Sequence, residues 1–354
     1  MTITTTGYYS TGSSAVYDLL REYSPCTEEV NRDNPIEHIF LYMPDGLFDL
    51  EDKLLIGNSI HRSDEAMNAF YQAMKDLYEN NYQVFGNYKK RYGKRFMAAV
   101  ENLIEDLTEY RVQGDWYYDY EMQFSLVHAA ASTLHKICNQ PVNANFFENI
   151  GHRDKFSDNI TRYAFPTEEG FYPKASAFIR EFFSMAQGDS QGVLLLDHLI
   201  LPHNAFRLPR YLEGDELKVI IVDRDPRDVY IDIRKRQERD GEIPPIPVDS
   251  KDFVRFWRAL RESERIVQLP KQVLRIKYED LFYKYEETVS LVEGFCGFTP
   301  DQHKYPGRFF DPSMAKEYIN QYKTDEKLTA TIQYIEKNLP EYLYNSQSGL
   351  ESGS

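Results

Sequence analysis

One stretch near the middle of the chain constrains the fold more than any other. Four apolar residues, Val219 to Val222, are followed by Asp223-Arg224-Asp225-Pro226 and then by a segment with helical spacing. Such an apolar run is typical of a strand buried on both faces of a parallel sheet, and Pro226 suits the first turn of a helix. The stretch predicts an α/β fold with Arg224 where a buried strand passes into a helix, the position at which open sheets bind ligands. A surface turn with a salt bridge is the alternative.

The N-terminus has a related pattern. Thr2 to Thr6 is β-prone, and Gly7 to Ser14 is rich in glycine and hydroxyl groups and precedes an amphipathic helix. Such a turn points backbone N–H groups and hydroxyl groups towards an anion, and the helix adds the positive end of its dipole. The turn lacks the Gly-Lys-Ser/Thr of a Walker A loop, which argues against a P-loop kinase. It predicts an anion site, with an ordinary helix start as the alternative.

Together these two stretches resemble those of the nucleotide-dependent sulfotransferases, which use the donor 3′-phosphoadenosine 5′-phosphosulfate (PAPS). In that family a Lys-Ser-Gly-Thr-Thr loop binds the 5′ side of the donor, and an Arg-Asn/Asp-Pro-Lys/Arg-Asp turn binds its 3′-phosphate. Arg224-Asp225-Pro226-Arg227-Asp228 is similar to that turn. A third segment, Val273 to Val289 with its Tyr278-Glu279-Asp280-Leu281, resembles the strand and helix that follow in the family. The resemblance covers the N-terminal strand, loop and helix and most of the chain after Gly192.

The resemblance implies a P-loop-type three-layer α/β sandwich with a central parallel sheet and a helical insertion. It implies one sulfotransferase-like domain over residues 1–345, with a mostly helical insertion over 62–190 beside the acceptor, and a disordered tail over 346–354. The implied reaction transfers the sulfuryl group of PAPS to a hydroxyl group, with adenosine 3′,5′-bisphosphate (PAP) as product and no metal. A carbohydrate acceptor is favoured. The alternatives are a sterol or phenol acceptor, and a non-catalytic nucleotide-binding or scaffold protein.

The resemblance also implies a set of donor-binding residues. Arg224 would bind the 3′-phosphate through two hydrogen bonds. Arg308 or Lys304, in a late basic loop, would close over that phosphate, with a plain surface loop as the alternative. Two positions depart from the family pattern: Ser10 stands where the family has its catalytic Lys, and Asp232 stands where it has a phosphate-binding Ser. The full set is Tyr9, Ser10, Thr11, Gly12, Ser13, Ser14, Arg224, Asp232, Tyr278 and Arg308.

The candidate base lies in a second predicted strand, Ile36 to Leu41, which follows a polar loop from Thr27 to Pro35. Glu37 or His38 would deprotonate the acceptor, by a loose resemblance to a Glu-x-His-Phe-Phe segment of the glycan-modifying sulfotransferases. A strand-end carboxylate and a packed histidine are the alternatives for these two residues, and Asp45, Asp49 and Glu51 are rival candidates for the base.

The cation that Ser10 does not supply would come from another part of the chain. Lys174, just before a helix predicted from Ala175 to Met185, is assigned to catalysis, and the basic cluster Lys89 to Arg95 is the other source. A solvated turn between helices is the alternative for that cluster.

Three residues are assigned to the acceptor. Gly192 to His198 is predicted as a buried strand with a polar end, and in the family this strand ends near the acceptor, so Asp197 and His198 are candidates. Trp116 lies in the densest aromatic stretch, which would pack on a flat acceptor. A strand-end cap and core packing are the respective alternatives.

Composition narrows the class of protein. The net charge of −15 argues against general nucleic-acid binding. The 3 cysteines are widely spaced, which argues against a disulfide framework or a cysteine metal site. No apolar run approaches transmembrane length, and the N-terminus has no secretion signal. The sequence thus predicts a cytoplasmic enzyme with a small-molecule or glycan acceptor, no nucleic-acid partner and no membrane span, and it leaves the oligomeric state open.

Overall fold

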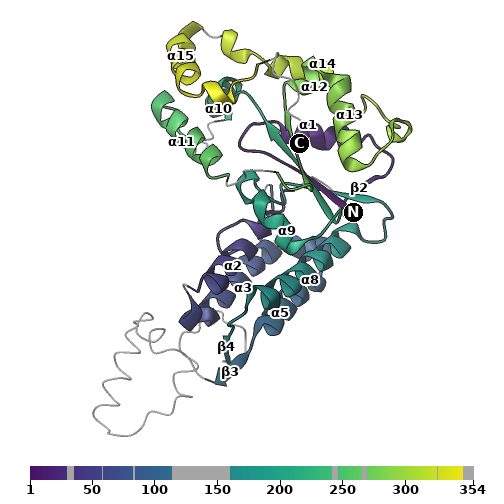
Figure 1. Ribbon diagram of the computed structural model, residues 1–354, viewed down its shortest axis with the longest axis vertical. Helices are drawn as coiled ribbons and strands as arrows, with labels where there is room; N and C mark the ends of the chain where they lie inside the picture. The colour runs from purple at the N-terminus through teal and green to yellow at the C-terminus, as the bar shows by residue number, and fades with distance from the viewer. Residues whose placement is uncertain are drawn as a thin grey trace.

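The computed structural model describes residues 1–29, 36–57, 59–82, 84–113, 160–240, 246–264, 269–324 and 326–345. A five-stranded sheet in the order β2-β5-β1-β6-β7 forms its centre (Figure 1), and every strand pair in it is parallel. The strands are β1 (Thr2–Thr6), β2 (Cys26–Glu28), β5 (Val193–Asp197), β6 (Leu217–Asp223) and β7 (Val273–Lys277). Because the strands run the same way, the residues that follow β1, β5, β6 and β7 meet at one edge of the sheet.

The sheet is the middle of three layers, because alternate strand residues face opposite sets of helices. On one face Ile3, Leu195 and Ile220 pack with α1 (Ser13–Leu20) and α13 (Tyr285–Cys296). On the other face Leu194, Leu196, Val219 and Ile221 share one core with the helical layer. That layer contains α2 (Leu47–Leu55), α3 (Ser63–Glu79), α5 (Lys94–Leu107) and α8 (Glu168–Gln187). The predicted α/β class with a central parallel sheet is confirmed.

A third apolar cluster lies beside the sheet edge. It is formed by α10 (Pro226–Asp240), α11 (Ser250–Glu262) and α15 (Thr329–Asn338), and it contains Tyr8 of the loop after β1. Phe253, Val254 and Trp257 form the buried face of α11. The loop after β1 is therefore packed against helices from the second half of the chain.

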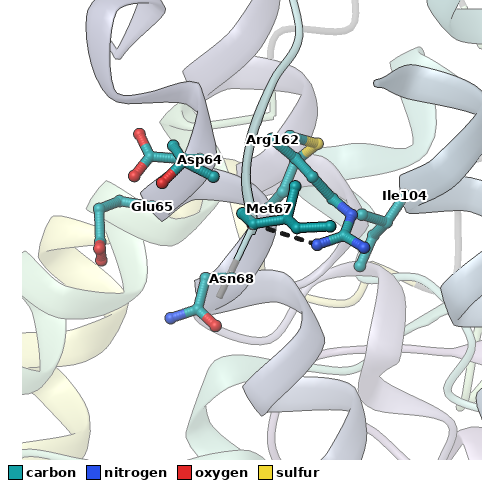
Figure 2. Close-up of a pocket in the computed structure, with 8 residues that line it drawn as sticks. Asp64, Glu65, Met67, Asn68, Ile104 and Arg162 are labelled. Carbon is teal, nitrogen blue, oxygen red and sulfur yellow. Dashed lines mark hydrogen bonds between the residues drawn. The ribbon is translucent and has the colours of Figure 1, made fainter. Parts of the chain in front are cut away.

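The helical layer extends away from the sheet and carries a small antiparallel pair, β3 (Tyr110–Gln113) and β4 (Ile160–Tyr163), at its farther end (Figure 1). A pocket there is lined by residues of α3, α5 and β4, and the guanidinium of Arg162 reaches across it (Figure 2). Arg162 Nη1 donates to the carbonyl of Ile160 at 3.2 Å. This pocket lies far from the loops at the sheet edge.

Shorter helices complete the fold: α4 (Tyr88–Tyr92), α9 (Leu208–Tyr211), α12 (Asp280–Tyr283) and α14 (Pro312–Ala315). Within the described ranges, no helix is long and apolar enough to cross a membrane. In the same ranges, no group of three or more His, Cys, Asp or Glu side chains is placed to hold a metal ion.

Two local predictions were wrong. The segment from Ile36 to Leu41 is not a strand: it pairs with β5 only through a single bridge between Glu37 and Asp197, and Ile39–Leu41 is a 3-10 helix. The edge beside β5 is instead taken by β2, part of the predicted polar loop. Helix α8 begins at Glu168, where Thr167 caps it, so Lys174 lies inside this helix and not before it.

Candidate active site

The loop after β1 ends in a helix N-terminus without a side-chain cap. Thr11 closes the turn on itself, because its Oγ1 donates to the carbonyl of Tyr8 at 2.8 Å. Ser10 and Gly12 have left-handed backbones, with φ of 57° and 85°. No side chain of the described residues caps α1, and the first N–H groups of a helix have no acceptor within it. This end of α1 is therefore suited to bind an anion.

Gly12 is required for this turn on two counts. Its positive φ disfavours any residue with a Cβ, and a Cβ built at Gly12 would overlap the ring of Tyr278. Tyr278 follows β7, and its amide donates to the carbonyl of Asp223 at 2.7 Å. The ring of Tyr278 thus fixes the loop against the ends of β6 and β7.

Arg224 brings a buried cation to the same loop. Its side chain follows β6 and the residue is 5% exposed. Nη1 donates to the carbonyl of Ser10 at 2.7 Å, and Nη2 donates to the carbonyl of Tyr318 at 2.6 Å. Nε has no hydrogen-bond partner among the described residues. A buried guanidinium with an unused N–H beside an uncapped helix is a second feature suited to an anion.

The two carboxylates of the Arg-Asp-Pro-Arg-Asp turn bind backbone amides from the last part of the chain, which also supplies the Tyr318 carbonyl to Arg224. Asp228 accepts from the amides of Asn320 and Tyr322 at 2.8 Å and 3.4 Å. Asp225 accepts from the amide of Tyr344 at 2.9 Å. Sequence reasoning missed this contact, because the turn carries no signal for which distant amides its carboxylates bind.

Glu279 binds the backbone of the Arg-Asp-Pro-Arg-Asp turn. Its Oε1 accepts from the amide of Asp225 at 2.7 Å. Burial raises the pKa of Glu279 to about 7, and the neighbouring Asp225 carboxylate adds to this, although backbone hydrogen bonds and Arg224 oppose it. This carboxyl group thus helps to fix the backbone from which Arg224 extends.

A histidine at the end of β5 lies against the first turn of α1. The Nδ1 of His198 is 2.8 Å from Asp197 Oδ1, and its Nε2 is 3.3 Å from the hydroxyl oxygen of Ser13. Burial lowers the pKa of His198, but the hydrogen bond to Asp197 and the charges of Asp197 and Glu37 outweigh it, so the pKa is raised. An imidazole oriented by a carboxylate is the usual arrangement of a general base.

Glu37 joins this group through the backbone bridge that pairs it with Asp197. Burial raises the pKa of Glu37, as does the charge of Asp197, while His198 and His38 oppose the shift. Of the sequence candidates, the structure therefore brings Glu37, Asp197, His198 and Ser13 together at the ends of β1 and β5.

His38 is placed differently. Its ring is 1% exposed, with Nδ1 at 3.1 Å from the hydroxyl of Tyr88 and Nε2 at 3.3 Å from Glu29. The ring also meets Phe182 edge-on. Because the His38 ring is almost fully buried between these protein groups, no acceptor hydroxyl can reach it, and the structure favours the packed histidine over the base for this residue.

The two predicted sources of a cation lie in the helical layer. Arg91 and Arg95 of the basic cluster pair with Glu29 and Glu181. Lys174 is partly buried in α8, and no hydrogen bond or ion pair among the described residues connects it to the loop after β1. Lys174 stays a prediction as a catalytic group.

Arg308 lies near the C-terminal end of α1. Its guanidinium stacks over Phe309, as does that of Arg21, the residue that ends α1. The amides of Phe309 and Phe310 donate to Glu22 at 2.8 Å and 3.0 Å. These bonds hold the late basic loop at the C-terminal end of α1, and the closing of Arg308 over the donor phosphate stays a prediction.

The remaining candidates lie around the loop or outside the described residues. Asp232 is on α10 and pairs with Arg236 at 3.1 Å. Tyr9 is 49% exposed, and its ring centre is 6.3 Å from that of Phe256 on α11. Ser14 is exposed in the first turn of α1. Trp116 and the tail over 346–354 lie outside the described residues.

The fold and the site are those of a three-layer α/β protein in which a helix start suited to an anion lies at the edge of a parallel sheet. No protein-family model matches the sequence, and no curated protein matches it. Solved structures do match, and sulfotransferases are among them. The sulfotransferase domain of the Synechococcus PCC 7002 olefin synthase has 12% identity and a TM-score of 0.39, over 95% of this chain and 93% of that domain.

Two further matches are of the same kind. The sulfotransferase domain from the curacin biosynthetic pathway has 14% identity and a TM-score of 0.42, over 96% of this chain and 97% of that domain. A sulfotransferase from Mycobacterium avium has 11% identity and a TM-score of 0.37, over 96% of this chain and 75% of that one. At these TM-scores the similarities carry no argument, and the function proposed below rests on the residues of the site.

Proposed function

We propose that this protein is a PAPS-dependent sulfotransferase that transfers the sulfuryl group to a hydroxyl group of a carbohydrate, with His198 as the general base. One observation carries the proposal: the Asp197-oriented ring of His198 lies 3.3 Å from Ser13, at the uncapped N-terminus of α1. A base and an anion site are thus adjacent, and a transfer from an anionic donor to a hydroxyl group needs both.

The residues present fit the donor in part. The N–H groups at the start of α1 and the hydroxyl of Ser13 suit a phosphosulfate, and Arg224 with its unused Nε–H suits the 3′-phosphate. The carboxylate of Asp232 would repel that phosphate, and its ion pair with Arg236 reduces the repulsion. Ser10 stands where the sulfotransferase family has a cation. In this chain its carbonyl accepts a hydrogen bond from Arg224.

The base supports the reaction in two steps. His198 takes the proton of the acceptor hydroxyl on Nε2, while Asp197 holds the hydrogen on Nδ1 and stabilises the charge that forms on the ring. Once protonated, the ring is a cation at the N-terminus of α1. It therefore offsets negative charge near the leaving phosphate, the task of the cation that Ser10 lacks.

A carbohydrate suits the surroundings of the base. The exposed ring of Tyr9 beside Phe256 offers a flat apolar surface of the kind on which sugar rings pack. The carboxylate of Glu37, paired through its backbone with Asp197, can accept hydrogen bonds from further hydroxyl groups of such an acceptor.

A second candidate function is nucleotide binding without transfer. Ser10 at the position of the family cation favours it, because the loop then binds an anion without a fixed positive side chain of its own. The distinction between the two functions depends on whether His198 supports turnover.

A transfer assay with labelled PAPS tests the proposal. Wild type, His198→Gln and the control His61→Gln, whose histidine is exposed in the helical layer, are offered glycans, sterols and phenols. We expect transfer to a glycan by wild type and His61→Gln, and a loss of about 10²- to 10⁴-fold in His198→Gln. Equal rates in His198→Gln and wild type would contradict the base assignment. PAP binding without transfer to any acceptor would favour the non-catalytic function.

A further inference from the structure

One hydroxyl group touches both halves of the proposed site. Ser13 is the first residue of α1 and is 6% exposed. Its Oγ lies at the end of the helix where the donor anion is proposed to bind, and also 3.3 Å from Nε2 of His198, the atom proposed to take the acceptor proton. We propose that Ser13 is a positioning residue that couples donor binding to the availability of the base. This inference rests on the proposed function.

The hydrogen atoms on the His198 ring and on the Ser13 hydroxyl determine the direction of their hydrogen bond before the donor binds. In the neutral form of His198, the carboxylate oxygen of Asp197 accepts the hydrogen on Nδ1 at 2.8 Å. Nε2 then carries no hydrogen and can only accept. Ser13 has a single hydroxyl hydrogen, which it donates to Nε2. The lone pair that the reaction needs is therefore occupied in the free protein.

Donor binding releases that lone pair. The oxygens of a phosphosulfate carry no hydrogen, so a hydroxyl group beside them must donate. Ser13 cannot donate its one hydrogen to the donor and to Nε2 at the same time. A hydrogen bond to a charged oxygen is stronger than one to a neutral nitrogen, so the hydroxyl turns to the donor. His198 then accepts from the acceptor hydroxyl only when the donor is in place.

The ring keeps its orientation during this exchange. Asp197 remains bonded to Nδ1, and the hydroxyl of Thr5 lies 3.5 Å from the same carboxylate oxygen. Glu37 is held beside Asp197 by its backbone bridge. The only change required is rotation of the Ser13 hydroxyl, so the coupling needs no movement of the backbone.

The ring nitrogens of His198 can be followed by long-range ¹H–¹⁵N NMR in wild type, Ser13→Ala and Ser13→Thr, at a pH where the ring is neutral, with and without saturating PAP. We expect PAP to move the Nε2 signal of wild type and Ser13→Thr away from its hydrogen-bonded position. In Ser13→Ala that position is already lost, and PAP should leave the signal nearly unchanged. An equal PAP-induced change in wild type and Ser13→Ala would overturn the coupling, because the charge of the phosphate alone would then explain it.

Calorimetry of PAP binding distinguishes a failure of the proposed function from a failure of the coupling through Ser13. We expect Ser13→Ala to bind PAP about tenfold more weakly than wild type, and Ser13→Thr to restore the affinity, because one hydrogen bond to a charged group is lost and regained. If wild type binds no PAP, the proposed function fails and the coupling fails with it. If wild type binds PAP but its Nε2 signal does not move, the coupling alone is wrong. Thermal denaturation of both variants checks that they are folded.

Discussion

Both ends of helix α1 lie beside a histidine and charged side chains, but the hydrogen-bonding groups at the two ends have different partners. At the C-terminal end the buried Glu22 accepts from the ring of His303 and from the amides of Phe309 and Phe310, all within 3.0 Å. At the N-terminal end no side chain of the described residues caps the helix, and the neighbouring Arg224 keeps an unused N–H.

The difference separates a structural contact from a candidate site. Glu22 is 0% exposed and its hydrogen bonds come from protein groups, so that end of α1 serves to fix the late loop. The other end brings His198 and the cation of Arg224 to a helix start that no side chain of the described residues caps. Matched substitutions at the two ends should therefore have different effects.

The largest effect is expected for the two histidines. His198→Gln should lower the rate of sulfuryl transfer by the folded protein about 10²- to 10⁴-fold, because it removes the proposed base. His303→Gln should leave the transfer rate of the folded protein unchanged and lower the free energy of unfolding by about 1–3 kcal/mol, because it takes one partner from the buried Glu22. Transfer assays and denaturant unfolding of both variants provide the test. A lower transfer rate in fully folded His303→Gln protein would contradict the assignment of a purely structural role to the C-terminal end of α1.

The next effect concerns the two arginines. Arg224→Ala should weaken PAP binding by about 10- to 150-fold, because it removes charge-assisted hydrogen bonds to the 3′-phosphate. Arg308→Ala should bind PAP like wild type, because its side chain stacks over Phe309 at the other end of α1. Calorimetric titration with PAP measures both affinities. Equal binding by Arg224→Ala and wild type would remove Arg224 from the donor site.

A smaller effect is expected for the two glycines. Gly307 has φ of 77° and open space around it, so Gly307→Ala should lower the free energy of unfolding by about 1–2 kcal/mol. Gly12→Ala has the same backbone strain and also an overlap with Tyr278. It should be the less stable variant and should lose PAP binding. Comparison of the two in unfolding and binding measurements tests this, and a Gly12→Ala variant with full affinity would show that the loop is not the anion site.

The smallest effect is opposite pH dependence at the two ends. The pKa of His198 is raised above 6.5 in the folded state, so its contribution to stability is present at low pH and lost as the pH rises through the folded pKa. Burial raises the pKa of Glu22, but hydrogen bonds from Phe310, His303 and Phe309 outweigh it and lower the pKa below 4.5, so its contribution is lost as the pH falls through the folded pKa.

This pH dependence is measured by unfolding across the pH range and by the pH profile of transfer. Because His198 acts as a base only when neutral, kcat/KM should rise as the pH passes its pKa. Asp197→Asn removes the charge that raises this pKa, so the rising limb should move to lower pH. A profile unmoved by Asp197→Asn would show that another group titrates.

The sequence predicted β1, β5, β6 and β7 and the loop after β1 because their signals are local. The apolar run before Asp223 and the glycine-rich turn before Ser13 each specify a strand end and a helix start without reference to the rest of the chain. The surroundings of His38 and His198 could not be predicted in the same way. Their partners Tyr88 and Ser13 are 50 and 185 residues away in the sequence, and no local pattern indicates them.

The position of Arg308 could not be predicted from the sequence for a similar reason. A late basic loop is compatible with either end of α1 by composition alone. The buried carboxylate of Glu22, to which the amides of Phe309 and Phe310 donate, decides between them. The segment that reaches Arg224 instead does so through a backbone carbonyl, that of Tyr318, and a backbone contact leaves no mark on the sequence.

The central claim is that the N-terminal end of α1, together with Arg224, binds a 3′-phosphorylated nucleotide. The most direct test is the thermal stability of the protein with PAP and with ADP. A ligand that binds only the folded state adds RT ln(1 + [L]/Kd), about 2.7 kcal/mol at one hundred times Kd. We predict a clear stabilisation by PAP and little by ADP. Stabilisation by ADP without any by PAP, or by neither nucleotide, would contradict the account.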